Sequence, residues 1–136
     1  MTQEPTLDPH IAMPLARTLG IAFTATTRET VEATLAWSPE LCTAGGVLHG
    51  GALMTLADSA GALCAFLNLP EGARTSTIES KTNFFRPLVR GLARAVARPL
   101  HVGRTIVVVQ TDILDEGGKR VAQTTQTQAV VPQRPA

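Results

Sequence analysis

The sequence predicts an α+β domain in which a curved antiparallel sheet of about six strands packs on one long helix. Most of the chain consists of short β-branched segments, and only one long segment has helical periodicity. The turns between extended segments are too short for parallel crossovers, so neighbouring strands are expected to run antiparallel. A length of 136 residues with 44% hydrophobic residues is typical of one domain, here residues 1–136, with its own core.

The chain begins with a predicted short helix and a hairpin. Residues 8–19 favour a helix that Asp8 caps and Gly20 closes. Residues 21–27 and 30–37 are rich in β-branched residues on both sides of a polar turn, which predicts a β-hairpin.

The long helix follows a glycine-bearing loop over residues 38–48. Apolar and small side chains in residues 49–69 recur at i, i+3 and i+4, and Pro70 and Gly72 end the pattern. Four further extended segments complete the sheet: residues 74–85, 92–100, 104–114 and 120–131.

The long helix carries almost no charge. Between Gly50 and Ala73 there is no Lys, Arg or His, and Asp58 and Glu71 are the only acids. A helix without a charged face is expected to be buried on both sides, and the sheet covers one of them. We therefore predict a homodimer through a second helix face formed by Met54, Ser59, Gly61, Ala62 and Ala65.

Asp58 is the one acid inside this helix. None of its neighbours at i±3 and i±4 carries a positive charge. A carboxylate in apolar surroundings has a raised pKa, as general bases do. The alternative is that Asp58 lies on a solvated stripe of the helix.

His49, Gly50 and Gly51 open the helix. Free backbone N–H groups point out of a helix start, and glycines let a substrate oxygen approach them, which favours an oxyanion hole. The alternative is a glycine turn with His49 as a packing or capping residue. Asp58 lies nine residues after His49, about 13.5 Å along the axis and half a revolution away, so one carbonyl reaches both only if two helices pack antiparallel across a two-fold axis.

Three motifs carry a family resemblance: residues 46–53 with the sequence GVLHGGAL, then Leu56-Ala57-Asp58, then residues 83–87 with Gly91. They resemble the motifs of hotdog-fold acyl-CoA thioesterases of the phenylacetate-pathway (PaaI-like) type. The resemblance covers residues 21–131. It implies a hotdog fold, dimers with a continuous sheet that pair into tetramers, and hydrolysis of an aryl or short to medium acyl-CoA to the free acid and coenzyme A.

The resemblance also implies roles for the residues of these motifs. The Gly50 N–H would polarise the thioester carbonyl, and Gly51 would help to shape the turn and bind substrate. His49 would orient the loop or bind near the thioester. Asp58 would act either as the nucleophile or as the general base that activates water.

Three further positions carry implied roles or depart from the family pattern. Thr77 falls where related enzymes place a Ser or Thr that positions the water or the acid, with Ser76 as the alternative. Thr43 stands where the family usually has Asn or Gln, and its hydroxyl has a shorter reach. Ala62 stands where one branch of the family has Ser or Thr.

Arginines are the candidates for binding the phosphates of coenzyme A, because the guanidinium fork suits phosphate. Arg86 and Arg104 are the two we select. Even spacing places three others on one face of an extended segment: Arg90, Arg94 and Arg98. A solvated strand face is the alternative for each of them.

Composition argues against several other classes of protein. A net charge of +1 and 4% aromatic residues do not favour nucleic-acid binding. The charge-free stretch is short for a membrane span, the first residues do not have the order of a signal peptide, and two cysteines fit a reducing compartment, so a cytoplasmic protein is expected. No metal-ligand spacing is present, and no cofactor is expected beyond the coenzyme A of the substrate.

Two other functions remain open on the same fold. A non-catalytic acyl-CoA sensor is one, although a binding module gains nothing from an unpaired acid beside a thioester. A dehydratase or hydratase is the other, although His49 beside glycines at a helix start suits an oxyanion role better.

Overall fold

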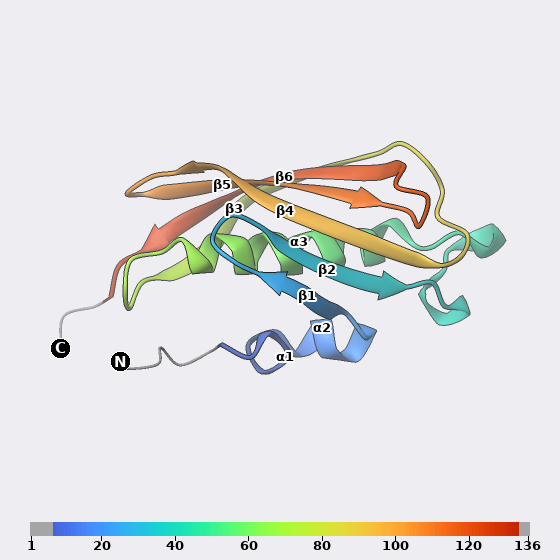
Figure 1. Cartoon of the computed structure of the whole chain (residues 1–136), viewed down its shortest axis with the longest axis horizontal. Coiled ribbons are helices and arrows are strands. Elements are labelled where there is room, and N and C mark those ends of the chain that lie inside the picture. Colours follow the sequence, from blue (N-terminus) through green and yellow to red (C-terminus); the bar gives the residue numbers. More distant parts are fainter. Residues whose placement is uncertain (1–6, 134–136) are drawn as a thin grey trace.

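A six-stranded antiparallel sheet curves around one long helix, α3 (Gly50–Leu67), as Figure 1 shows. The computed structural model describes residues 7–133, so the ends of the predicted domain lie outside the described range. The strand order is β1-β2-β4-β5-β6-β3. The predicted curved sheet and central helix are thus confirmed.

The N-terminal segment forms two short helices where one was predicted, α1 (Pro9–Ala12) and α2 (Pro14–Leu19). Pro14 has no N–H to donate and disfavours helical geometry at the residue before it, so the helix breaks at Met13. Both predicted ends are confirmed. The Asp8 carboxylate accepts a hydrogen bond from the His10 N–H at 2.9 Å, and Gly20 adopts a left-handed φ of 77°.

All six predicted strands are present, with shifts of a few residues at some ends. β1 (Ala22–Thr26) and β2 (Val31–Ala36) form the predicted hairpin. β4 (Leu92–Val102), β5 (Ile106–Leu114) and β6 (Arg120–Val131) form a meander, and β4 pairs with β2. The inner faces of these strands carry small and branched side chains that pack on α3.

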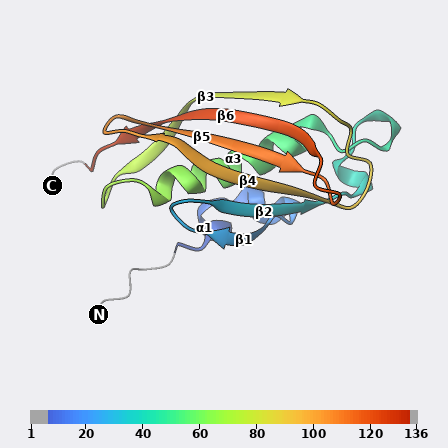
Figure 2. The ribbon, with the colours of Figure 1, turned by 45° about the horizontal axis from the view of Figure 1, so that its top comes forward.

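β3 (Arg74–Phe84) lies at the edge of the sheet, beside β6. It directly precedes β4 in the chain, but the two strands do not pair, because residues 85–91 carry the chain across the end of the sheet (Figure 2). One edge of β3 therefore has no strand partner within residues 7–133, and most of its side chains are exposed.

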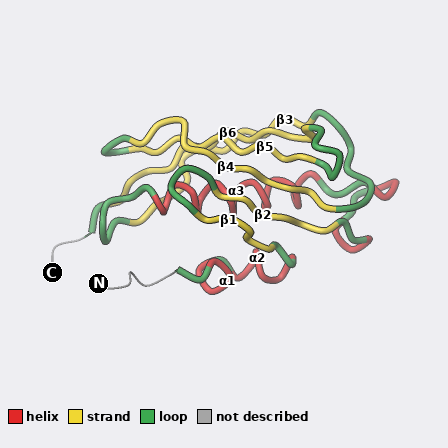
Figure 3. Tube along the Cα trace, in the orientation of Figure 1, coloured by secondary structure: helices red, strands yellow, loops and turns green. Residues whose placement is uncertain are grey.

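α3 is buried more widely than one flat sheet would achieve. Figure 3 shows it lying beneath the sheet, with α1 and α2 on the side of β1 and β2. By length and composition α3 could cross a membrane, but half of it is buried within this chain, and it is the core helix of the fold.

The predicted outer face of α3 was partly wrong. Ser59, Gly61 and Ala65 are already buried within the chain, because the curved sheet returns along β6 and β3 to cover that flank. The face left open is a narrower stripe at spacing i+4, with three exposed residues and one half-buried: Met54, Asp58, Ala62 and Phe66.

Candidate active site

The start of α3 presents one backbone N–H group that is capped and one that is free. His49 is the N-cap, and its Nδ1 accepts a hydrogen bond from the Gly51 N–H at 2.8 Å. The Gly50 N–H has no hydrogen-bond partner among residues 7–133. Because Nδ1 accepts, the proton of the neutral imidazole lies on Nε2, which leaves Gly50 as the open donor of this turn.

The loop before α3 is held by backbone hydrogen bonds. The His49 N–H donates to the Leu41 carbonyl at 2.8 Å, and the Leu48 N–H donates to the Leu88 carbonyl at 2.8 Å. The Thr43 N–H donates to the Val47 carbonyl, which closes a tight glycine-bearing turn. The helix start is therefore fixed both to the preceding loop and to the segment between β3 and β4.

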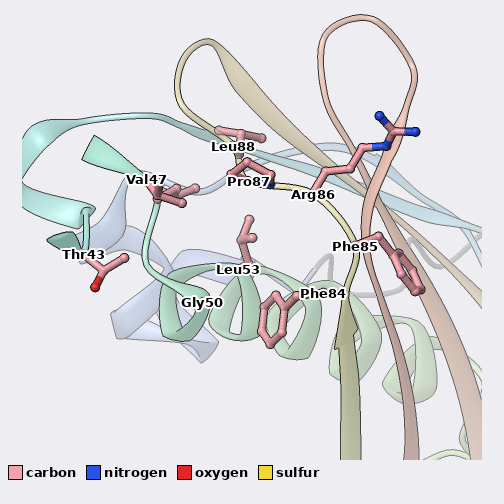
Figure 4. Close-up of a pocket in the computed structure, with 10 residues that line it drawn as sticks. Thr43, Val47, Gly50, Leu53, Phe84, Phe85, Arg86, Pro87 and Leu88 are labelled. Carbon is pink, nitrogen blue, oxygen red and sulfur yellow. The ribbon is translucent and has the colours of Figure 1, made fainter. Parts of the chain in front are cut away.

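A pocket of about 370 Å³ lies at the helix start. Figure 4 shows Phe84 beside Gly50, with Thr43 and Val47 on the loop and Leu53 on the helix. The Phe84 ring lies so near that a Cβ on Gly50 would sit 3.2 Å from it. A side chain at Gly50 would therefore require the ring to shift, and the structure brings Thr43 and Gly50 to the same mainly apolar pocket.

A second pocket of about 300 Å³ lies on the other flank of the helix start. It is lined by His49 and Gly51 together with apolar side chains of α2. The two pockets share the first turn of α3, so the helix start separates two hollows rather than closing one.

Asp58 has an exposed edge in the isolated chain, yet its carboxylate is partly desolvated. Burial raises the pKa of Asp58 above its ordinary value, and a hydrogen bond from Gln126 lowers it by a smaller amount. The Gln126 Nε2 donates to Asp58 Oδ1 at 3.1 Å. Both predicted environments therefore apply in part: Asp58 lies on the exposed stripe of α3, and its carboxylate is partly desolvated.

Thr77 and Asp58 each accept a hydrogen bond from a glutamine of β6. The Gln128 Nε2 donates to the Thr77 hydroxyl at 2.9 Å, and Gln126 binds Asp58 from the same face of the strand. Residues two apart on one face lie about 7 Å from each other. Ser76 lies on the opposite face of β3, because successive side chains alternate. Of the two candidates, Thr77 is the one on the inner face.

Sequence reasoning missed Gln126 and Gln128. Both are buried, with 0% and 1% exposure. Residues 123–128 read Gln-Thr-Thr-Gln-Thr-Gln, so both faces of this strand are polar. One of the two polar rows had to face the helix, and that alternation was the available signal.

The arginine candidates do not gather in one chain. Arg86 lies at the rim of the pocket and extends away from Gly50 (Figure 4). Arg104 lies in the turn between β4 and β5, at the far end of β6, about 30 Å from Arg86 along that strand. Within one chain these two arginines therefore do not form a joint phosphate site.

The predicted row of three arginines on one strand face was wrong for one member. Arg90 precedes β4 and is not in the strand. Arg94 forms an ion pair with Glu32 on β2 at 2.9 Å, and Arg98 is exposed on β4. Arg94 thus serves the solvated strand face that was the alternative.

The cysteines have no place in the site chemistry. Cys64 is fully buried in the core, as predicted, and burial raises the pKa of its thiol to about 11. Cys42 is half-buried and donates its thiol proton to the Ser38 carbonyl, with a sulfur–oxygen distance of 3.3 Å.

Comparison with known proteins gives the family. Residues 45–122, more than half of the chain and including the start of α3 and Asp58, match the model of the thioesterase superfamily. The chain belongs to this superfamily. A 1,4-dihydroxy-2-naphthoyl-CoA hydrolase of Escherichia coli is 32% identical over 83% of each chain. A proofreading thioesterase of Cronobacter turicensis is 31% identical over 86% of this chain and 85% of its own.

Solved structures agree with this assignment. A thioesterase of Haemophilus influenzae has a TM-score of 0.86 and 30% identity, covering 99% of this chain and 98% of its own. A thioesterase of Pseudomonas aeruginosa, solved as a variant, has a TM-score of 0.87 and 31% identity, covering 96% of both chains. The fold is the hotdog fold, and the protein is a thioester hydrolase.

Proposed function

We propose that this thioesterase hydrolyses an aryl or short to medium acyl-CoA with the Gly50 N–H as oxyanion donor and Asp58 as the nucleophile or general base. The single observation that carries the proposal is that the first two N–H groups of α3 differ in their hydrogen bonding. His49 accepts the Gly51 N–H, whereas the Gly50 N–H has no partner among residues 7–133, and Gly50 lines the pocket beside Phe84.

The oxyanion donor acts where charge develops. When a nucleophile attacks the thioester carbon, its oxygen becomes negative and binds the Gly50 N–H at the positive end of the α3 dipole. Collapse of the tetrahedral intermediate breaks the carbon–sulfur bond and releases the coenzyme A thiolate. Asp58 either attacks the carbon itself, with water hydrolysing the resulting anhydride, or takes the proton of an attacking water.

Gly50 and Asp58 come from different copies of the chain in this proposal. Within one α3 the two residues lie about 12 Å apart along the axis. A homodimer that covers the stripe from Met54 to Phe66 and the free edge of β3 would bring Asp58 of one protomer to the helix start of its partner. Pairing of two dimers is the larger assembly we expect.

The pocket supports a substrate class rather than one substrate. Its walls include Val47, Leu53 and Leu88, and Phe84 offers a ring for stacking. A relative acts on an aromatic acyl-CoA, 1,4-dihydroxy-2-naphthoyl-CoA. Arg86 at the rim is the candidate for a coenzyme A phosphate, and no cofactor beyond the substrate and water enters the proposed reaction, which we assign to the cytoplasm.

Release of free thiol from a panel of short, medium and aromatic acyl-CoAs tests the reaction. Wild-type protein should turn over one class best, and Asp58→Asn should lower kcat by about 10²- to 10⁴-fold while leaving the protein folded. Near-normal hydrolysis by the Asn variant would remove Asp58 from the mechanism. Acyl-CoA bound but not cleaved would point to a sensor, and enoyl-CoA formed from a hydroxyacyl-CoA would point to a dehydratase.

A further inference from the structure

Gln126 is a fully buried amide that is only half satisfied. It projects inward from β6, between Val109 of β5 and Ser80 of β3, with 0% exposure. Its Nε2 donates to Asp58 Oδ1, whereas its Oε1 has no hydrogen-bond partner among residues 7–133. A buried oxygen without a partner is costly, so packing alone does not explain a glutamine here.

Gly61 provides the space for this amide. A Cβ on Gly61 would lie 2.0 Å from Gln126 Oε1 and 2.6 Å from its Cδ, so any side chain there would displace the amide. Gly61 is inside α3 and has no positive φ, so the backbone conformation does not require a glycine here. What the glycine provides is room for the Gln126 amide. Glycine is unfavourable in a helix interior relative to alanine. Two unfavourable residues thus meet at one contact.

The contact with Gln126 gives Asp58 a hydrogen-bond donor. Ala62, one turn further along α3, presents only a methyl group, and Gln126 is the one side-chain donor to Asp58 among residues 7–133. The two ion pairs of the described chain lie elsewhere, Arg94 with Glu32 and Arg120 with Asp112. One oxygen of Asp58 is therefore held, and the other remains free.

We infer that Gln126, seated against Gly61, is a positioning residue that holds Asp58 Oδ1 and so directs Oδ2 toward the thioester or the attacking water. The inference rests on the proposed role of Asp58. A carboxylate fixed in one orientation reacts faster than one that rotates freely, because less ordering is needed at the transition state. The buried Oε1 and the helix glycine are the structural cost of that orientation.

Gln126→Met tests the inference, because methionine fills a similar volume and has no donor. We expect kcat to fall about 10-fold with KM within about 2-fold of the wild-type value, since the contact orients Asp58 and does not bind substrate. The donor lowers the pKa of Asp58, so its loss should move the acidic limb of the kcat profile to higher pH. Gly61→Ala should change kcat in the same direction, because the new methyl displaces the amide.

Thr124→Val is the matched control. Thr124 lies two residues before Gln126 on the same inner face and is equally buried. The substitution removes the hydrogen bond of 2.7 Å between the Thr124 and Thr82 hydroxyls. Its variant should lose stability without a change in kcat or in the pH profile. If Gln126→Met unfolds, Gln126→Leu and Gly61→Ala give the same comparison.

Two results separate this inference from the proposed function. Wild-type kcat and an unmoved acidic limb in folded Gln126→Met, with Asp58→Asn inactive, would overturn the positioning role alone. An active Asp58→Asn enzyme would overturn the role of Asp58 and the inference with it.

Discussion

The Gly50 N–H and the Asp58 carboxylate are each placed at a cost to stability. Gly50 leaves an N–H without a partner in the described chain beside an apolar pocket, and Asp58 keeps a partly desolvated carboxylate. The proposed function accounts for both, because Gly50 would stabilise negative charge that appears on the substrate and Asp58 would supply the nucleophile or base. Sites that work in this way trade stability for activity.

This trade predicts how Asp58 affects stability with pH. Asp58 ionises at a higher pH in the folded chain than in the unfolded chain, because burial raises its pKa. The folded state therefore binds the proton more tightly, so the contribution of this group to stability is largest below the ordinary pKa and falls as the pH rises through the folded-state value.

We expect Asp58→Asn to melt about 2–4 °C above wild type at pH 7 and to match it at a pH below the ordinary aspartate pKa. Thermal unfolding of both proteins across this pH range measures the difference. A variant that melts below wild type at neutral pH, with the gap unchanged in acid, would contradict the desolvated carboxylate.

At the scale of elements, local sequence patterns predicted the strands and the long helix, and packing decided the rest. The break at Met13 depends on Pro14, which a pattern of apolar residues does not register. The buried flank of α3 with Ser59 and Gly61 depends on how far the sheet curls, a property of β3 pairing with β6 across the whole chain.

The residues of the candidate site, too, could be predicted from the sequence only in part. The glycines at the start of α3 and the acid in its interior could be read from sequence, because helix starts and unpaired charges have local signatures. Gln126 and Gln128 could not be assigned to the site, since their alternation fits an exposed strand face equally well. Only the position of β6 over α3 shows which row faces Asp58 and Thr77.

His49 provides a prediction about the first turn of α3. Its imidazole accepts the Gly51 N–H, so His49→Ala should lower the free energy of unfolding by about 0.5–2 kcal/mol, the usual value of an N-cap. His49→Asn keeps an oxygen acceptor at the cap and should retain most of that stability. Denaturant unfolding of both variants checks this, and equal losses in both would contradict a capping role.

At the scale of the whole molecule, the exposed surface supports the proposed homodimer. The open stripe of α3 bears Met54 and Phe66, and the edge strand β3 exposes Ile78 and Phe84. In the proposed dimer, a second copy would cover this apolar stripe and the unpaired strand edge. In the proposed dimer that copy also brings the acid that each helix start lacks.

Activity in mixed dimers tests this account most directly. Asp58→Asn removes the acid, and Gly50→Val covers the oxyanion donor and crowds Phe84. Each variant alone should be inactive while remaining a folded dimer. When the two are unfolded and refolded together in equal amounts, half of the dimers are mixed, and each mixed dimer has one intact and one doubly defective site.

Thiol release from acyl-CoA by this mixture should recover to about a quarter of the wild-type rate. If each site were built within one chain, every site in the mixture would carry one defect. The mixture would then remain as inactive as the two variants, and the shared site would be contradicted.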